Sequence, residues 1–253
     1  MIETTLILPE REKKPRNKGL TILIDNGIPL RFFTDTINSG SDYIDYVKFG
    51  WGTSVVTRYL KEKIEVLKQN HISYFFGGTL FEKFYSQNKI EDFKHYCQYW
   101  GCEVIEISNG TVSLSSQEKT KWIQQFSKDF RVFSEVGSKD HQIAENVQSS
   151  EWMEDIKRDF DSGAERVITE ARESGTSGIC GKDGEIRLDI MDELKRINIP
   201  IDTMIFEAPN KKLQTYFIKA FGPNVNLANI AFTDVISLET LRLGLRSDTF
   251  YGG

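Results

Sequence analysis

The sequence is poor in the residues that mark several classes of protein. It has 3 cysteines and no Cys-x-x-Cys pair, so a disulfide framework is not expected. It has 3 histidines, too few for a multi-histidine site, and any bound metal is expected to be a hard cation held by carboxylates. No apolar run approaches the roughly 20 residues that span a membrane. The amino terminus lacks the apolar segment of a secretory signal, so a cytoplasmic location is expected.

The charge balance excludes a further group of functions. The net charge is -5, which argues against a general binder of nucleic acids or of anionic membranes. Hydrophobic residues make up 39% of the chain, enough to bury a sizeable core. Residues 1–18 are rich in lysine and arginine, and we expect a solvated lead-in there rather than an anion-binding arm. Residues 246–253 form a polar, glycine-ended tail.

The stretch from Tyr43 to Ser54 shows a plan that the chain repeats. An apolar strand ends at Lys48, a turn with glycines at 50 and 52 follows, and Thr53 and Ser54 are candidate N-caps of a long helix. Seven further apolar runs are each followed by a helical pattern. They cover residues 20–25, 72–78, 103–108, 131–137, 166–175, 203–209 and 224–230. Eight alternating strands and helices predict a parallel sheet closed into a (β/α)8 TIM barrel.

An open, doubly wound α/β sheet is the competing fold. It usually carries a glycine fingerprint after the first strand, and Asp25-Asn26-Gly27 does not supply G-x-G-x-x-G. No long linker or shift in composition divides the chain. We therefore predict a single barrel domain over residues 1–253.

In such a barrel the active site lies at the carboxyl ends of the strands and in the loops that follow them. Those positions carry many polar residues: Asp25, Lys48, Glu82, Glu106, Ser108, Asn109, Glu135, Lys139, Glu170, Arg172, Ser174, Glu207, Asn226 and Asn229. A barrel that only needed packing would place aliphatic residues at many of them. Four carboxylates recur at late strand positions, and converging with Asp25 they are candidates to bind Mg²⁺: Glu106, Glu135, Glu170 and Glu207.

Basic residues at the same end predict a pocket for a small anion with several charges. They are Lys48, Lys139, Arg172 and Lys211. The loop that includes Ser174 and Gly175 offers backbone N–H groups of the kind that bind phosphate. The segments 209–211 and 226–229, after the last two strands, are a second candidate phosphate site. Lys48 is also a candidate for Schiff-base chemistry, which we rank below anion binding or proton transfer.

Long motifs at the strand ends resemble the phosphosulfolactate synthase family. They read YIDYVKFGWGTS, GGTLFEKFYS, EISNGT, SEVGSKD, EARESG, IFEAPNKK and NVNLANIAFTDVISLETLRLGLRSDT, in order from residue 43 to residue 249. The resemblance implies a TIM barrel and a carbon–sulfur lyase. Its members add sulfite to phosphoenolpyruvate in a Mg²⁺-dependent reaction that gives (2R)-phospho-3-sulfolactate. It also implies that the chain forms a homo-oligomer, and that in bacteria it serves sulfolactate production.

The resemblance implies roles for individual residues. Lys48, Lys139 and Arg172 are expected to bind the anions, and one lysine is expected to donate a proton. Glu106 joins the two lysines as a candidate catalytic residue. The expected substrate contacts are Asp25, Arg172, Ser174, Gly175, Asn226 and Asn229. Glu135, Glu170 and Glu207 are the candidate Mg²⁺ ligands.

Three positions depart from the pattern of archaeal family members. This chain has Asn26 and Ser138 where those members carry lysine, and Asn109 where they carry aspartate. Two alternatives therefore stay open. One is a non-catalytic barrel that acts as a stress or binding protein. The other is a related phosphoenolpyruvate or aldolase-type enzyme with a different co-substrate.

Overall fold

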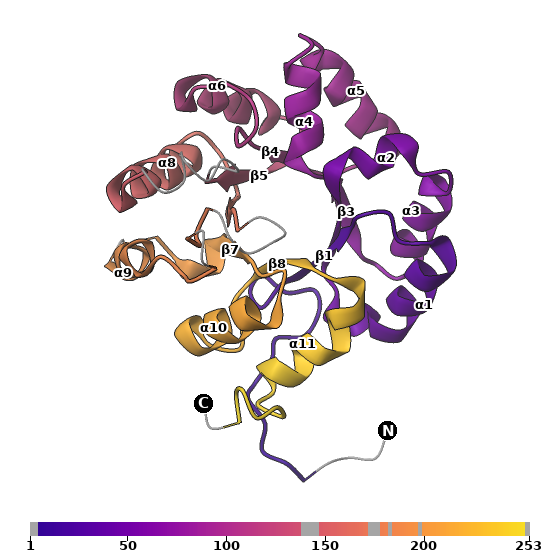
Figure 1. Ribbon diagram of the computed structural model, residues 1–253. Helices are drawn as coiled ribbons and strands as arrows, with labels where there is room; N and C mark the ends of the chain where they lie inside the picture. Colours follow the sequence, from indigo (N-terminus) through magenta and orange to yellow (C-terminus); the bar gives the residue numbers. More distant parts are fainter. Residues whose placement is uncertain (1–4, 138–146, 172–177, 182–183, 197–198, 251–253) are drawn as a thin grey trace.

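The computed structural model describes residues 5–137, 147–171, 178–181, 184–196 and 199–250. Eight parallel strands form a nearly closed barrel, and the helices that connect them lie around its outside (Figure 1). The hydrogen-bonded order is β3-β2-β1-β8-β7-β6-β5-β4, and the two end strands, β3 and β4, contact each other. The predicted (β/α)8 TIM barrel is confirmed.

The strands are short and buried. They are β1 (Thr21–Asp25), β2 (Tyr46–Phe49), β3 (Ser73–Phe76), β4 (Val104–Ile107), β5 (Arg131–Val136), β6 (Arg166–Thr169), β7 (Met204–Glu207) and β8 (Leu227–Ile230). Each strand is buried on both faces because one face meets the barrel interior and the other meets the helices. Because the strands are parallel, their carboxyl ends all lie at the same end of the barrel.

The helices follow the strands in the expected alternation. They are α1 (Leu30–Gly40), α2 (Thr53–Val56), α3 (Leu60–Gln69), α4 (Gly78–Tyr85), α5 (Ile90–Trp100), α6 (Ser116–Phe126), α8 (Ser149–Asp161), α9 (Leu188–Arg196), α10 (Lys211–Phe221) and α11 (Val235–Arg242). Short 3₁₀ turns are η1 (Ser41–Tyr43), η2 (Gly50–Gly52), η3 (Ile201–Thr203) and η4 (Phe232–Asp234). None of the helices in the described part of the chain is both long enough and apolar enough to cross a bilayer.

The long helix predicted after β2 is broken into α2 and α3, and the helical stretch after β3 is broken into α4 and α5. α2 ends because Thr57 takes an extended backbone, with φ −75° and ψ 116°. The preceding residues, Val55 and Val56, are β-branched like Thr57 and weaken the helix there. α4 and α5 are separated at residues 86–89, where Asn88 has a left-handed backbone with φ 57°. The first break leaves α2 as a short helix beside η2.

The side chains that point into the barrel form two levels. The lower level is apolar and consists of Leu20, Ile22, Tyr46, Phe75, Val104, Phe133, Ile168, Ile205 and Ala228. Side chains alternate between the two faces of a strand, so residues two positions later also point inward. On five strands those residues are Lys48, Glu106, Glu135, Glu170 and Glu207, and all five line one pocket. The upper level of the barrel interior is therefore charged.

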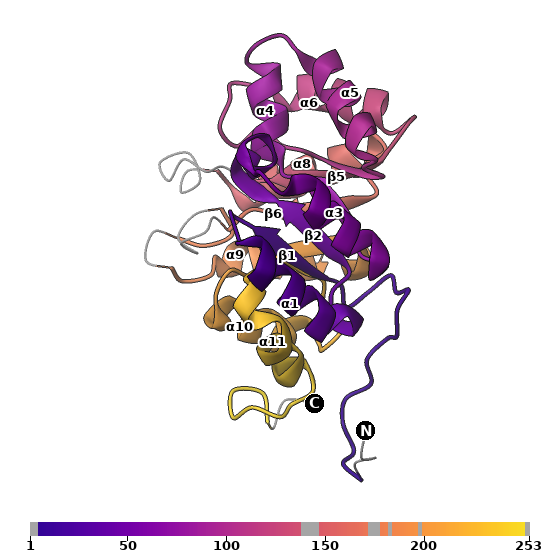
Figure 2. The ribbon, with the colours of Figure 1, turned by 90° about the vertical axis from the view of Figure 1, so that its right-hand side faces the viewer.

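The amino-terminal arm closes the opposite end of the barrel. The Arg11 guanidinium forms a bidentate ion pair with Glu239, at 2.9 and 3.2 Å, and donates to Asn224 Oδ1 at 2.6 Å. The Arg16 guanidinium pairs with Asp45 just before β2, at 2.9 Å. The arm and the carboxyl-terminal segment lie on the same side of the molecule (Figure 2). The expectation of a solvated lead-in is therefore wrong for these two arginines, whose side chains are buried in ion pairs.

Candidate active site

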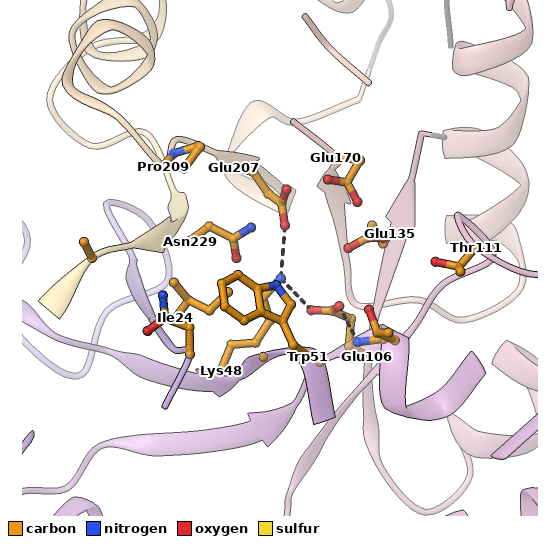
Figure 3. A pocket seen from close by; sticks show the side chains of 16 residues that line it. Ile24, Lys48, Trp51, Glu106, Thr111, Glu135, Glu170, Glu207, Pro209 and Asn229 are labelled. Atoms are coloured by element: carbon orange, nitrogen blue, oxygen red, sulfur yellow. Dashed lines mark hydrogen bonds and ion pairs between the residues drawn. The ribbon is translucent and has the colours of Figure 1, made fainter. Parts of the chain in front are cut away.

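A cavity of about 530 Å³ opens at the carboxyl ends of the strands. Its wall includes the charged upper level of the barrel interior, residues of η2 and the start of α4, and the segments after β7 and β8 (Figure 3). Among the described residues that line it, the charged side chains are one lysine and four glutamates. These five side chains are the centre of the candidate site.

Lys48 lies between two carboxylates. Its Nζ is 3.0 Å from Glu207 Oε1 and 3.3 Å from Glu106 Oε2, and all three side chains are almost fully buried (Figure 3). Burial alone would lower the pKa of Lys48, but the carboxylates of Glu106, Glu207 and Glu135 together raise it above its ordinary value. Lys48 is therefore held as a cation.

Both carboxylate oxygens of Glu106 have a partner. Its Oε1 accepts a hydrogen bond from the Gly78 backbone N–H at 2.6 Å, and its Oε2 faces Lys48. Burial raises the pKa of Glu106 to about 7, the ammonium of Lys48 opposes the rise, and the nearby carboxylate of Glu135 adds to it. Glu106 therefore holds a proton for part of the time near neutral pH.

Neighbouring groups fix the strand ends on the other side of the pocket. Glu207 Oε2 accepts a hydrogen bond from the Ala171 backbone N–H at 3.0 Å. The Glu135 carbonyl accepts one from Lys119 Nζ at 2.6 Å, and Lys119 also pairs with Asp159 at 2.7 Å. These contacts hold the ends of β5, β6 and β7 in place around the pocket.

Asn229 enters the pocket because β8 is irregular. Three residues of β1, from Thr21 to Leu23, are matched to four residues of β8, from Leu227 to Ile230. Asn229 has a left-handed backbone, with φ 56°, and lines the pocket although regular alternation would turn it outward. Its buried Oδ1 accepts no hydrogen bond from the described residues. The irregular pairing therefore places the side chain of Asn229 in the pocket, where its Oδ1 can still accept a hydrogen bond.

Two residues expected at the site lie elsewhere. Asp25 faces the helices: its Oδ2 pairs with Lys63 of α3 at 2.5 Å, and its Oδ1 accepts hydrogen bonds from Gly27 and Ile28 N–H. Its expected convergence with the glutamates is therefore wrong. Asn226 precedes β8, at the opposite end of the barrel, where it binds the backbone of Leu20 and Met204. Its expected substrate contact is wrong because the strand begins later than the apolar run.

Several other expected residues are placed differently. Lys211 does not line the cavity and pairs with Asp248 at 3.1 Å. Lys139, Arg172, Ser174 and Gly175 lie outside the residues that the structure describes. The structure also brings Trp51, Thr79 and Thr111 to the cavity. Their motifs were visible in the sequence, but no charge or spacing singled these three residues out.

Comparisons with known proteins show the family to which the chain belongs and support the fold. The sequence profile of the (2R)-phospho-3-sulfolactate synthase (ComA) family matches residues 9–248. This chain belongs to that family. The resemblance drawn from the strand-end motifs is thus confirmed, and with it the prediction of a lyase-type enzyme.

Relatives in the phosphosulfolactate synthase family match over nearly their whole length. The phosphosulfolactate synthase of Bacillus subtilis (strain 168) is 59% identical over 251 residues, which cover 99% of this chain and 100% of the relative. That of Methanocaldococcus jannaschii is 45% identical over 238 residues, which cover 92% and 94%. Orotidine 5′-phosphate decarboxylase from Pyrococcus horikoshii OT3 has a similar structure, with a TM-score of 0.55, 9% identity and coverage of 88% and 98%. At that identity the likeness shows the fold alone.

The positions that depart from the archaeal pattern of the phosphosulfolactate synthase family have different surroundings. Asn26 lines the pocket, so a neutral amide stands there in place of a charged group. Asn109 donates a hydrogen bond to the Leu114 carbonyl at 2.9 Å and thereby holds the loop after β4. Ser138 lies outside the described residues.

The carboxylates of the pocket do not form a complete metal cage. Within the described ranges, no three histidine, cysteine, aspartate or glutamate side chains are grouped so as to hold a metal ion by themselves. A cation bound here would need further ligands from water or substrate. Oxygen donors in an acidic pocket suit a hard divalent cation rather than a soft one.

Proposed function

We propose that this chain is a phosphosulfolactate synthase that adds sulfite to phosphoenolpyruvate, with Mg²⁺, and gives (2R)-phospho-3-sulfolactate. The observation that carries the proposal is the buried Lys48 at the centre of four inward-facing glutamates, in a member of this family. Such a pocket combines a fixed cation with carboxylates suited to a second cation. The substrates are two anions, so both features serve their binding.

The charge of the pocket supports a role for Mg²⁺. The described lining residues supply four carboxylates against one ammonium group, which would repel two anionic substrates. Glu135, Glu170 and Glu207 would hold the ion, with one or two of them in direct contact and water or substrate oxygens completing its shell. Mg²⁺ would supply electrostatic stabilisation of the substrate carboxylate as negative charge develops there.

The side chains of the protein would bind and orient sulfite and phosphoenolpyruvate and would supply the proton that completes the reaction. A sulfur lone pair of sulfite forms the new C–S bond at the methylene carbon, and the electrons of the C=C bond move toward the carboxylate. A proton then adds to the carbon that bears the phosphate. Sulfite is its own nucleophile, so no activated serine or cysteine is required. Lys48, Lys139 and Arg172 would bind the anions, one of the two lysines would give the proton, and Glu106 would hold the ammonium of Lys48 in place.

The state of Lys48 supports anion binding over imine formation. A Schiff base needs a neutral amine, and Lys48 lies between two carboxylates that favour its charged form. The spare hydrogen-bonding capacity of Asn229 supports a second contact to substrate, on the β8 side of the pocket.

The test is a sulfite-consumption assay with phosphoenolpyruvate. We expect turnover that requires both substrates, is lost with EDTA and returns with Mg²⁺. The Glu170→Gln variant should need about tenfold more Mg²⁺ for half-maximal rate. The matched control is Glu165→Gln, which removes a carboxylate from an exposed pair with Arg131 and should leave that requirement unchanged. Turnover that persists in EDTA would contradict the role of Mg²⁺. A folded chain that consumes no sulfite would overturn the reaction itself.

A further inference from the structure

Glu82 is a buried carboxylate behind the pocket wall. It lies on α4, one helical turn after Gly78, and its residue exposure is 1%. Its Oε1 accepts hydrogen bonds from the Ser108 hydroxyl and, at 3.1 Å, from Gly110 N–H. Its Oε2 accepts one from Thr111 N–H at 3.0 Å. All three donors belong to the segment directly after β4, so one side chain holds residues 108–111.

The same helix also holds Glu106. The Gly78 N–H donates to Glu106 Oε1 at 2.6 Å, and Ser108 stands so close to Gly78 that a Cβ there would lie 2.3 Å from the Ser108 hydroxyl. α4 therefore clamps β4 and the following loop at two points, one turn apart. Thr111, at the end of the clamped segment, lies at the edge of the pocket beyond Glu135 (Figure 3).

Ordinary packing does not require a carboxylate at position 82. Burying a charge costs several kcal/mol unless hydrogen bonds compensate for the lost water. An apolar residue of similar size would fill the space without that cost. Only a carboxylate presents two acceptor oxygens that can satisfy two backbone N–H groups and a hydroxyl together.

We propose that Glu82 is a positioning residue, and that through the loop it holds, the Thr111 hydroxyl contacts the bound anion. Thr111 lines the pocket, and its own N–H and that of Gly110 both donate to Glu82. The contact with the anion rests on the proposed substrates, whereas the fixed loop does not. The two parts are therefore tested by different measurements.

The first measurement is hydrogen exchange at the amides of Gly110 and Thr111. In Glu82→Gln one acceptor oxygen becomes an NH₂ group that faces a donor, so exchange at these two amides should rise at least tenfold. The matched control is Glu239→Gln, which alters a buried carboxylate at the other end of the barrel and should leave their exchange unchanged. Unchanged exchange in Glu82→Gln would overturn the positioning role, whatever reaction the chain catalyses.

The second measurement is the KM for phosphoenolpyruvate. Thr111→Val should raise it about tenfold, as loss of one hydrogen bond does, and Thr111→Ser should restore it. Glu82→Gln should raise it at least as much, and the double variant Glu82→Gln/Thr111→Val should be no worse than Glu82→Gln alone. Additive effects, or an unchanged KM in Thr111→Val, would overturn the contact. If Glu82→Gln does not fold, Glu82→Asp replaces it in both measurements, because it keeps the carboxylate but draws it back from the N–H groups of Gly110 and Thr111.

The turnover of the wild-type chain distinguishes a failure of this inference from a failure of the proposed function. If it does not turn over phosphoenolpyruvate and sulfite, the proposed function fails and the anion contact of Thr111 fails with it. The exchange measurement still decides whether Glu82 positions the loop. If the wild-type chain is active and the effects of Glu82→Gln and Thr111→Val on the KM are additive, the proposed function stands and the inference fails.

Discussion

Lys48 Nζ lies 3.0 Å from Glu207 Oε1, and this buried contact joins β2 to β7 across the inside of the barrel. Strands that are not neighbours in the sheet are therefore linked through the active site. Removing Lys48 would leave the buried carboxylates of Glu207 and Glu106 without their shared counter-ion, whereas removing Glu207 would leave Lys48 paired with Glu106 alone.

Lys48→Met should cost both stability and activity. Loss of the ammonium leaves Glu106 and Glu207 uncompensated, which should lower the free energy of unfolding by about 3 kcal/mol. Turnover of sulfite and phosphoenolpyruvate should fall at least a thousandfold, because the fixed cation of the pocket is lost. Urea denaturation and the sulfite assay measure the two effects.

The matched control for Lys48 is Lys63→Met. Lys63 is also a buried lysine in an ion pair, with Asp25, but it lies on the helix side of β1 and not in the pocket. We expect a similar loss of stability with most of the turnover retained. If Lys63→Met abolished turnover as fully as Lys48→Met, the loss would reflect disturbed packing rather than pocket chemistry.

The stability of the protein should fall as pH rises across the titration of Glu106. The pKa of Glu106 is raised from its ordinary value of 4.5 to about 7, mainly by burial. Between these two values the unfolded chain releases a proton that the folded chain keeps, so rising pH favours unfolding, and the stabilisation is lost above the folded value. Glu106→Gln should flatten this part of the profile. Urea denaturation at several pH values between these two pKa values measures this dependence. If the free energy of unfolding falls with pH equally steeply in the wild-type chain and in Glu106→Gln, the prediction is contradicted.

A methyl group at Gly78 should disturb the site, whereas one at Gly77 should not. A Cβ at position 78 would lie 2.3 Å from Ser108 Oγ and 2.9 Å from Glu106 Oε1. Gly78→Ala should cost roughly 2 kcal/mol of stability, as overpacking does, and more than tenfold in turnover. At Gly77 the nearest atoms are 3.5 Å from such a Cβ and φ is −66°, so Gly77→Ala should change stability by less than about 0.5 kcal/mol. Equal effects of the two substitutions would refute the clamp on Glu106.

Trp51 should report substrate binding by fluorescence. It lines the pocket and has a left-handed backbone, with φ 54°, which bulky residues rarely adopt, and 49% of its surface is exposed. Phosphoenolpyruvate binding should exclude water from the indole and change its emission. Trp51→Phe should remove the signal, and Trp100→Phe, at the end of α5 and away from the pocket, should keep it. A signal that survives Trp51→Phe would place the change at another tryptophan.

The fold and the acidic half of the site could be predicted from sequence because both follow from strand periodicity. Glu106, Glu135 and Glu207 each stand two positions after an inward apolar residue, so their direction follows from the alternation of a strand. The same rule, applied with the correct register, turns Asp25 outward, one position after the pocket residue Ile24. Composition alone does not fix the register.

Other parts of the site depend on features that periodicity does not encode. Asn229 lines the pocket because the pairing between β1 and β8 is irregular. Asn226 lies at the opposite end of the barrel because β8 begins one residue after it. Glu82 and Thr111 meet only because α4 packs against the loop after β4, a contact between segments about thirty positions apart in the chain. Local patterns predict the elements, whereas these contacts arise only when the barrel closes.

The ion pair between Arg11 and Glu239 has a consequence for the order of events during protein synthesis. Arg11 leaves the ribosome well before strand β8, since Asn224 and Glu239 follow it by 213 and 228 positions. Because β1 pairs with β8, β1 keeps one unpaired edge until β8 has been made. A nascent chain arrested before residue 224 would expose that edge to chaperones and proteases. The arm can thus form its ion pair only after the segment through Glu239 has been made.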